Sequence, residues 1–166
     1  MPITPFHFGP GAVLHALAPR QVSFIAFCAA NVVIDVEPLY YMITRQFHLH
    51  RFFHTYIGAT LIAVATIALF IAARWVARRV WLPKLFEWRE LALMPVVLGA
   101  AAGSYSHVLL DSIMHDDIRP FAPFSDANPL LRIIELDTLH LACLAAGALG
   151  LFILALRDLH RRGKLR

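Results

Sequence analysis

The segment TYIGATLIAVATIALFIAA, residues 55–73, contains no charged side chain. A helix needs roughly 20 apolar residues to cross the hydrocarbon core of a bilayer, and this segment is close to that length. Two more segments have the same character: LALMPVVLGAAAGSYSHVLL at residues 91–110 and TLHLACLAAGALGLFILAL at residues 138–156. The sequence therefore predicts three transmembrane helices.

The N-terminal region is apolar in shorter pieces, with Pro19 and Arg20 breaking the pattern between them. We expect a helical hairpin within residues 1–40, which could add a fourth crossing. Gly99 and Gly103 form a GxxxG pair, which predicts a close helix contact inside the chain. The fold class predicted is an all-α integral membrane bundle, with one membrane-embedded domain over residues 1–166 and an outer loop at residues 111–137.

The composition excludes an ordinary soluble domain. Of the 166 residues, 59% are hydrophobic and only 16% are charged, whereas a typical soluble domain has roughly 25% charged residues. The net charge is +4, but the basic residues lie beside the apolar runs and do not alternate with exposed aromatic residues. We therefore expect the lipid bilayer as a partner and no nucleic acid.

The distribution of lysine and arginine predicts the orientation. These residues gather between residues 74 and 89 and again after residue 156. Basic loops resist translocation, so both segments, and with them the C-terminus, are expected on the cytoplasmic side. Residues 35–54 and 111–137 would then lie on the outer or periplasmic face.

A helical pattern of donors carries the main functional clue. His107, Asp111 and His115 are spaced four residues apart and would share one face of a helix. Imidazole and carboxylate groups are good ligands for zinc and other first-row divalent metals. An ionisable group at membrane depth is costly unless it is paired or coordinated. We favour metal ligation by His107 and Asp111, and a structural His–Asp hydrogen bond is the alternative.

Further donors lie at the ends of the other apolar segments. Asp35 and Glu37 follow one such segment, His54 precedes another, and His7 lies near the N-terminus. If the hairpin returns the chain to the level at which it begins, these donors converge at one membrane depth. Metal ligation is the hypothesis for Asp35 and His54, with helix capping or an interfacial anchor as the alternative. For His7, metal ligation and a purely structural role are about equally supported.

Several other residues are secondary candidates. His50 could support the site or lie at the membrane surface, and Arg51 could neutralise an anionic substrate or pair with Glu37. Additional ligands could come from His115, Asp116 and His140. His115, Asp116 and Asp117 could bind a second metal, although composition favours a solvated acidic loop for these three residues. Packing against neighbours is the alternative for His140.

These motifs resemble those of the membrane-bound metal-dependent hydrolase family, which is distantly similar to zinc-dependent phospholipase C. The matching positions are Thr4-Pro5-Phe6-His7, Asp35, His50-Arg51 with His54-Thr55, His107 to Asp111, and the proline-rich stretch Arg119 to Phe124. The resemblance implies a divalent metal, zinc first, and a bacterial inner-membrane location. It also implies that the metal ligands are His7, Asp35, His54, His107 and Asp111.

The function expected from these residues is metal-dependent hydrolysis at the membrane interface. Metal-activated water would attack a phosphoester or ester of a lipid-like substrate. Glu37 or Asp111 could accept the proton, and Arg51 could contact an anionic group. The alternative is a non-catalytic metal-binding membrane protein that stores, senses or transfers an ion. Transport is disfavoured because polar groups do not continue through the inner halves of the three apolar segments.

Overall fold

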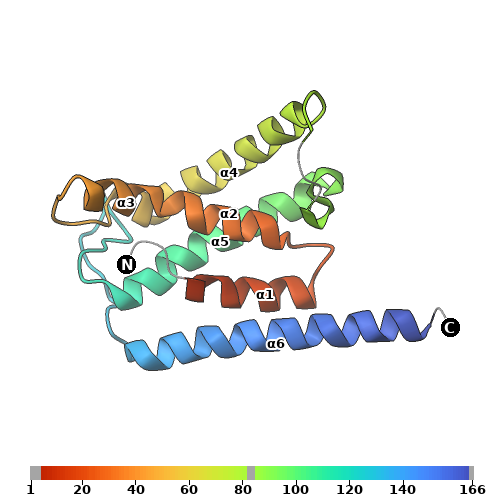
Figure 1. Ribbon diagram of the computed structural model, residues 1–166. Helices are drawn as coiled ribbons and strands as arrows, with labels where there is room; N and C mark the ends of the chain where they lie inside the picture. Colours follow the sequence, from red (N-terminus) through yellow and green to blue (C-terminus); the bar gives the residue numbers. More distant parts are fainter. Residues whose placement is uncertain (1–4, 82–84, 165–166) are drawn as a thin grey trace.

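The computed structural model describes residues 5–81 and 85–164, in which all regular structure is helical (Figure 1). Thr4, Lys84 and Arg166, on which parts of the sequence analysis rest, lie outside the described residues. The elements are η1 (Pro5–His7), α1 (Phe8–Leu17), α2 (Phe24–Ile34), α3 (Val36–Ile43), η2 (Phe52–His54), α4 (Tyr56–Val76), η3 (Leu85–Glu90), α5 (Leu93–Met114) and α6 (Leu136–Gly163). The all-α fold class is confirmed.

Four candidate membrane spans are present in the described part of the chain. The three predicted transmembrane helices correspond to α4, α5 and α6, with ends that differ from the prediction by a few residues. The fourth span is Phe24–Ile43, made by α2 and α3, so the N-terminal hairpin does contain a helix long enough to cross. Helix α1 has 10 residues and is too short, because each residue adds about 1.5 Å of helix length.

The outer loop starts later than expected. Helix α5 continues to Met114 and so includes Asp111, which the sequence analysis placed at the start of the loop. Hydrogen bonding continues through this turn: the His115 amide donates to the carbonyl of Asp111, and the Ser112 hydroxyl donates to the carbonyl of Val108. The extra turn keeps the whole pattern from His107 to Asp111 on a regular helix, at 22 residues in total.

Small side chains allow α5 to lie directly against α2. A Cβ atom added at Gly99 would lie 2.3 Å from the carbonyl oxygen of Ser23, and one at Gly103 would lie 2.5 Å from that of Phe27. Real Cβ atoms do not approach backbone oxygens so closely, so glycine is required at both positions. The predicted GxxxG contact is therefore made within the chain, between α2 and α5.

The helices are arranged so that the loops with the candidate donors gather at one end. In Figure 1, α3, the segment after it, the loop between α5 and α6, and the first helix turn lie toward one end of the bundle. The C-terminal end of α6 and the short helix η3 lie toward the opposite end. Helix α1 packs along α6, while α2, α4 and α5 pack on one another around a core of alanine, isoleucine and valine. This arrangement brings residues far apart in the sequence to one end of the bundle.

Candidate metal centre

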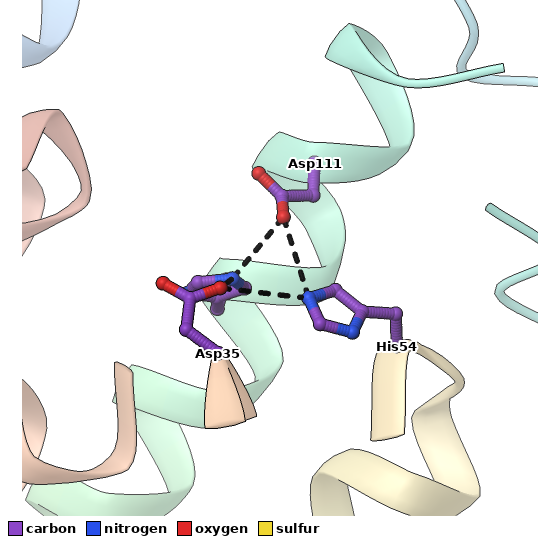
Figure 2. Close-up of side chains that lie close together, drawn as sticks. Asp35, His54 and Asp111 are labelled. Atoms are coloured by element: carbon purple, nitrogen blue, oxygen red, sulfur yellow. Dashed lines mark ion pairs between the residues drawn. The ribbon is translucent and has the colours of Figure 1, made fainter. Parts of the chain in front are cut away.

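Four buried side chains from three segments meet at the loop end of the bundle. Asp35 lies at the junction of α2 and α3, His54 ends η2, and His107 and Asp111 lie one turn apart on α5. Each offers one ligand atom, and these atoms all lie within 4.8 Å of one another. Figure 2 shows the side chains of Asp35, His54 and Asp111 pointing toward a common centre. We call these four residues the inner cluster; it could hold a metal ion.

The distances between the donor atoms suit a shared cation. His107 Nε2 lies 3.3 Å from Asp35 Oδ1 and 3.1 Å from Asp111 Oδ2. His54 Nε2 lies 3.8 Å from Asp35 Oδ1 and 3.5 Å from Asp111 Oδ2. Four nitrogen and oxygen ligands at tetrahedral positions around zinc would be separated by about 3.4 Å, given metal–ligand distances of roughly 2.0–2.1 Å. The observed separations bracket that value.

The donor atoms are deeply buried and poorly satisfied by the protein alone. The four residues are 0–4% exposed. Within the described residues, the Nε2 atoms of His54 and His107 make no hydrogen bond of good geometry, and carboxylate oxygens of Asp35 and Asp111 lie 3.1–3.8 Å from them. Two buried carboxylates need a positive charge beside them. A cation held between these donor atoms would supply that charge, which is the fit expected of a metal site.

Asn31 fixes the orientation of His107. The Asn31 side-chain NH₂ group donates to the carbonyls of Phe27 and Gly103, at 2.9 and 3.4 Å. Its Oδ1 atom therefore faces His107 Nδ1, 3.0 Å away, and accepts a hydrogen bond from it. With the proton on Nδ1, the lone pair of His107 is on Nε2, which points to the two carboxylates.

Glu37 occupies the equivalent position behind His54. Its Oε2 atom lies 3.5 Å from His54 Nδ1 and accepts hydrogen bonds from the backbone amides of Arg51 and Phe53. Glu37 was expected as a proton acceptor, and the structure places its carboxylate on the side of the ring that faces away from the inner cluster. His54 Nδ1 makes no hydrogen bond within the described residues, so Glu37 acts on the ring through its charge. The next residue, Thr55, caps α4 by accepting a hydrogen bond from Gly58.

The charge balance of the inner cluster favours a positive group at its centre. Burial disfavours the charged form of His54, but the nearby carboxylates of Asp111, Asp35 and Glu37 outweigh it and raise the pKa of His54 to about 10. A proton and a metal ion compete for such a nitrogen. The carboxylates that hold the proton on the metal-free protein are therefore the groups that would hold a divalent cation.

His7 reaches the edge of the inner cluster from η1. Its Nε2 atom lies 2.9 Å from Asp111 Oδ1, the carboxylate oxygen that is not approached by His54 and His107. The His7 ring stacks on the His107 ring, with centroids 4.3 Å apart. The structure thus brings all five predicted ligands together, although His7 is not among the four whose donor atoms lie within 4.8 Å of one another.

A second group of donors lies beside the first. His50, Asp111 and His115 each offer a ligand atom, again within 4.8 Å of one another. The His50 and His115 rings stack with centroids 4.4 Å apart. Burial lowers the pKa of His115, which keeps its ring neutral. We call this the outer group.

The remaining candidates lie away from the donors. Asp116 is exposed, and the His140 ring stacks on Phe6 with centroids 4.4 Å apart, which agrees with its packing alternative. The Arg51 side chain is exposed; its guanidinium lies 3.7 Å from the centre of the Tyr41 ring and donates to the carbonyl of His48. Only the backbone amide of Arg51 contacts Glu37.

A cavity of about 480 Å³ opens next to the outer group. Two arginines, two histidines, one aspartate and a face of apolar and hydroxyl side chains meet there. The lining residues are His48, His50, Arg51, Phe52, Thr55, Asp117, Arg119, Ala122 and Pro123. The sequence analysis proposed an anion-contacting role for Arg51 and did not assign one to Arg119. Arg119 begins the proline-rich stretch that resembles the hydrolase family, and this position could have marked it as a candidate.

Comparisons of this chain with protein-family models, curated proteins and solved structures find no match. The resemblance to membrane-bound metal-dependent hydrolases therefore rests on the motif residues alone. Asn31, which contacts the His107 ring, had no predicted role. Asp117, expected either to bind a second metal or to lie in a solvated acidic loop, instead contacts the His50 ring. An asparagine in the middle of the apolar run FIAFCAANVVI was a usable signal for Asn31.

Proposed function

We propose that this protein is an integral membrane hydrolase that uses a divalent metal ion to cleave a phosphoester or ester of an anionic amphiphile. The observation that carries the proposal is the inner cluster, in which two imidazoles and two carboxylates lie 3.1–3.8 Å apart in a buried site. A structural role for these residues would be expected to satisfy their buried nitrogen atoms with hydrogen bonds.

The ligands in this proposal are Asp35, His54, His107 and Asp111, with His7 beside Asp111. A mixed set of nitrogen and oxygen donors with tetrahedral spacing suits zinc best, and other first-row divalent metals next. When bound, such an ion lowers the pKa of water toward 7 and polarises a phosphoryl or ester oxygen.

The protein residues around the ligands have distinct parts in the proposed reaction. Asn31 and Glu37 hold the rings of His107 and His54 so that Nε2 faces the centre. Asp111 Oδ1 and His7 Nε2, 2.9 Å apart, form a pair that can hold a proton released from the attacking water. Asp111 would then serve as ligand and as proton acceptor through different oxygens.

The cavity supports an anionic substrate. Arg51 and Arg119 both line it, and guanidinium groups bind phosphate or carboxylate well. Its volume of about 480 Å³ is within the roughly 300–1,000 Å³ of small-molecule sites. Thr55, which lines the cavity, directly precedes α4, a candidate span, so a lipid head group is the substrate class we favour. The proposed orientation places it on the periplasmic face, with the C-terminus in the cytoplasm.

Non-catalytic metal binding is the second candidate function. The burial of the inner cluster favours it, because residues that are 0–4% exposed would shield an ion from substrate. Such a protein would store, sense or transfer the ion. It would bind metal with the same ligands but would show no turnover.

Metal content and turnover together separate these candidates. The purified protein in lipid nanodiscs would be analysed for bound metals and then tested with phospholipids and soluble phosphoesters, beside His107→Ala and the exposed-site control His160→Ala. Hydrolysis that needs metal, is lost in His107→Ala and is retained in His160→Ala supports the proposal. Bound metal without hydrolysis supports the second candidate, and a wild-type protein that binds no metal contradicts both.

A further inference from the structure

The outer group shares one residue with the inner cluster, and this sharing suggests a larger site. We infer that His50, His115 and Asp111 hold a second divalent cation, with the Asp111 carboxylate shared between two metal positions. The donor atoms of the three residues lie within 4.8 Å of one another. The inference rests on the proposed function, because Asp111 is also a ligand of the inner cluster.

His50 is oriented in the way that a metal-binding histidine requires. Asp117 Oδ1 lies 2.8 Å from His50 Nδ1 and accepts its hydrogen bond. The other oxygen of Asp117 accepts hydrogen bonds from the backbone amides of Leu49 and His50, at 2.9 and 3.2 Å. The carboxylate is therefore fixed by the backbone and fixes the ring in turn, which places the proton on Nδ1 and the lone pair on Nε2.

The same arrangement recurs at both histidines of the inner cluster. Asn31 Oδ1 is hydrogen-bonded to His107 Nδ1 at 3.0 Å. Glu37 Oε2 lies 3.5 Å from His54 Nδ1, an ion-pair contact without a hydrogen bond. In all three cases an oxygen atom faces the ring nitrogen that is not directed to the ligand group. Histidines that bind metals almost always have such a partner. The His50 ring therefore has an oxygen atom facing its Nδ1, as the two inner histidines do, although His50 lies outside the inner cluster.

His115 is positioned by the end of α5. Its backbone amide donates to the carbonyl of Asp111 at 2.8 Å, and its ring stacks on His50 at a centroid distance of 4.4 Å with 27° between the planes. Stacking alone would bring the two rings together but would not require a carboxylate beside both.

Asp111 has the geometry of a shared ligand. Its Oδ2 atom lies 3.5 Å from His54 Nε2 and 3.1 Å from His107 Nε2, and a carboxylate oxygen of Asp111 also lies within 4.8 Å of ligand atoms of His50 and His115. A carboxylate that reaches two groups of donors can join two ions, and sites of this kind hold ions about 3.5–4 Å apart. Asp111 is only 3% exposed, so both oxygens need partners within the protein.

The location of the outer group gives the second ion a distinct part in the proposed reaction. His50 lines the cavity together with Arg51 and Arg119, whereas the four inner residues do not. An ion held by His50 and His115 would therefore lie between the buried inner cluster and the cavity. This position resolves the difficulty posed by burial, because the outer ion can meet a substrate that the inner ion cannot reach.

The number of zinc ions bound per chain tests this inference. Metal-free protein in nanodiscs would be dialysed against buffered Zn²⁺ and measured by elemental analysis, with folding checked by circular dichroism. We expect two ions in the wild type, one in His50→Gln and in His115→Gln, and none in Asp111→Asn. The control His160→Gln, whose side chain is exposed on α6, should bind two.

Other outcomes separate the two proposals. One ion in the wild type, lost in His107→Gln and kept in His115→Gln, would overturn the second site and leave the inner one. No ion in the wild type would overturn both, and two ions that persist in both outer-group variants would overturn the assignment to His50 and His115. Electron paramagnetic resonance of the Mn²⁺-loaded wild type needs no variant: coupled ions support a shared Asp111, and an isolated six-line spectrum contradicts it.

Discussion

The two halves of α5 are buried to a similar degree but stabilise the protein in opposite ways. From Val96 to Gly103 the buried positions are small and apolar, and they lie directly against the backbone of α2. From His107 to Ser112 they include an imidazole and a carboxylate, whose partners come from α2, η1 and η2. The first half needs a surface that fits, whereas the second needs charges and lone pairs from several other segments.

This difference shows that burial alone does not identify a site in a membrane helix. Ala100 and His107 are both almost fully buried. For Ala100 the bilayer or another helix would be an equally good environment, because lipid tails and protein interiors are both apolar. For His107 and Asp111 only a small set of partners is acceptable, since an unpaired ionisable group at membrane depth is costly.

Removing the charge of Asp111 should have the largest effect on the polar half of α5. In Asp111→Asn, we expect metal affinity to fall by more than about 100-fold, because even residues that only support a ligand cost 10–100-fold when changed. Competition with a zinc chelator measures this. An affinity within a few-fold of the wild type would show that Asp111 is not a ligand.

The next largest effect should come from Asn31, which holds His107 from α2. We expect Asn31→Leu to weaken metal binding by about 10–100-fold, since the His107 ring loses the oxygen that fixes its orientation. Asn31→Asp keeps that oxygen and should recover most of the affinity. Equal losses in the two variants would mean that packing between α2 and α5, and not the hydrogen bond, is what Asn31 provides.

The apolar half should respond to added volume. In Gly103→Ala, the new methyl group would meet the carbonyl of Phe27 at 2.5 Å, and we expect a loss of about 1–3 kcal/mol of stability from overpacking. Gly147→Ala is the matched control, because its nearest neighbour would be 3.5 Å away. Thermal unfolding in nanodiscs compares them; similar melting temperatures would contradict the close contact of α5 with α2.

The smallest expected effect is the pH dependence of stability, which tests how charge contributes in the polar half of α5. The carboxylates around His54 raise its pKa to about 10 in the metal-free protein, against about 6.5 when unfolded. The protonated ring therefore stabilises the fold fully below pH 6.5, and this contribution is lost as the pH rises toward 10.

We accordingly expect the Tm of the chelator-treated protein to fall by a few degrees between pH 7 and pH 10. Saturating zinc should reduce this fall, because the ion replaces the proton. His54→Gln should flatten the profile of the metal-free protein. A Tm that is equally sensitive to pH in wild type and variant would contradict the proposed charge balance.

The fold could be predicted from the sequence because hydropathy is a local property. Residues 55–73 are apolar whatever surrounds them, and a run of that length has few stable states other than a membrane helix. The ends of the helices were less predictable. Helix α5 extends past Asp111 through the hydrogen bonds of Ser112 and His115, which depend on backbone geometry beyond the apolar run.

The sequence by itself determined the membrane helices and the spacing of His107 and Asp111, because both follow from neighbours within a few turns. Only the tertiary structure decided which oxygen lies behind each histidine. Asn31, Glu37 and Asp117 contact rings that are 76, 17 and 67 positions away in the chain. Such pairs depend on how α2 packs on α5 and on the conformation of the loops. A periodic sequence pattern predicts neither of these.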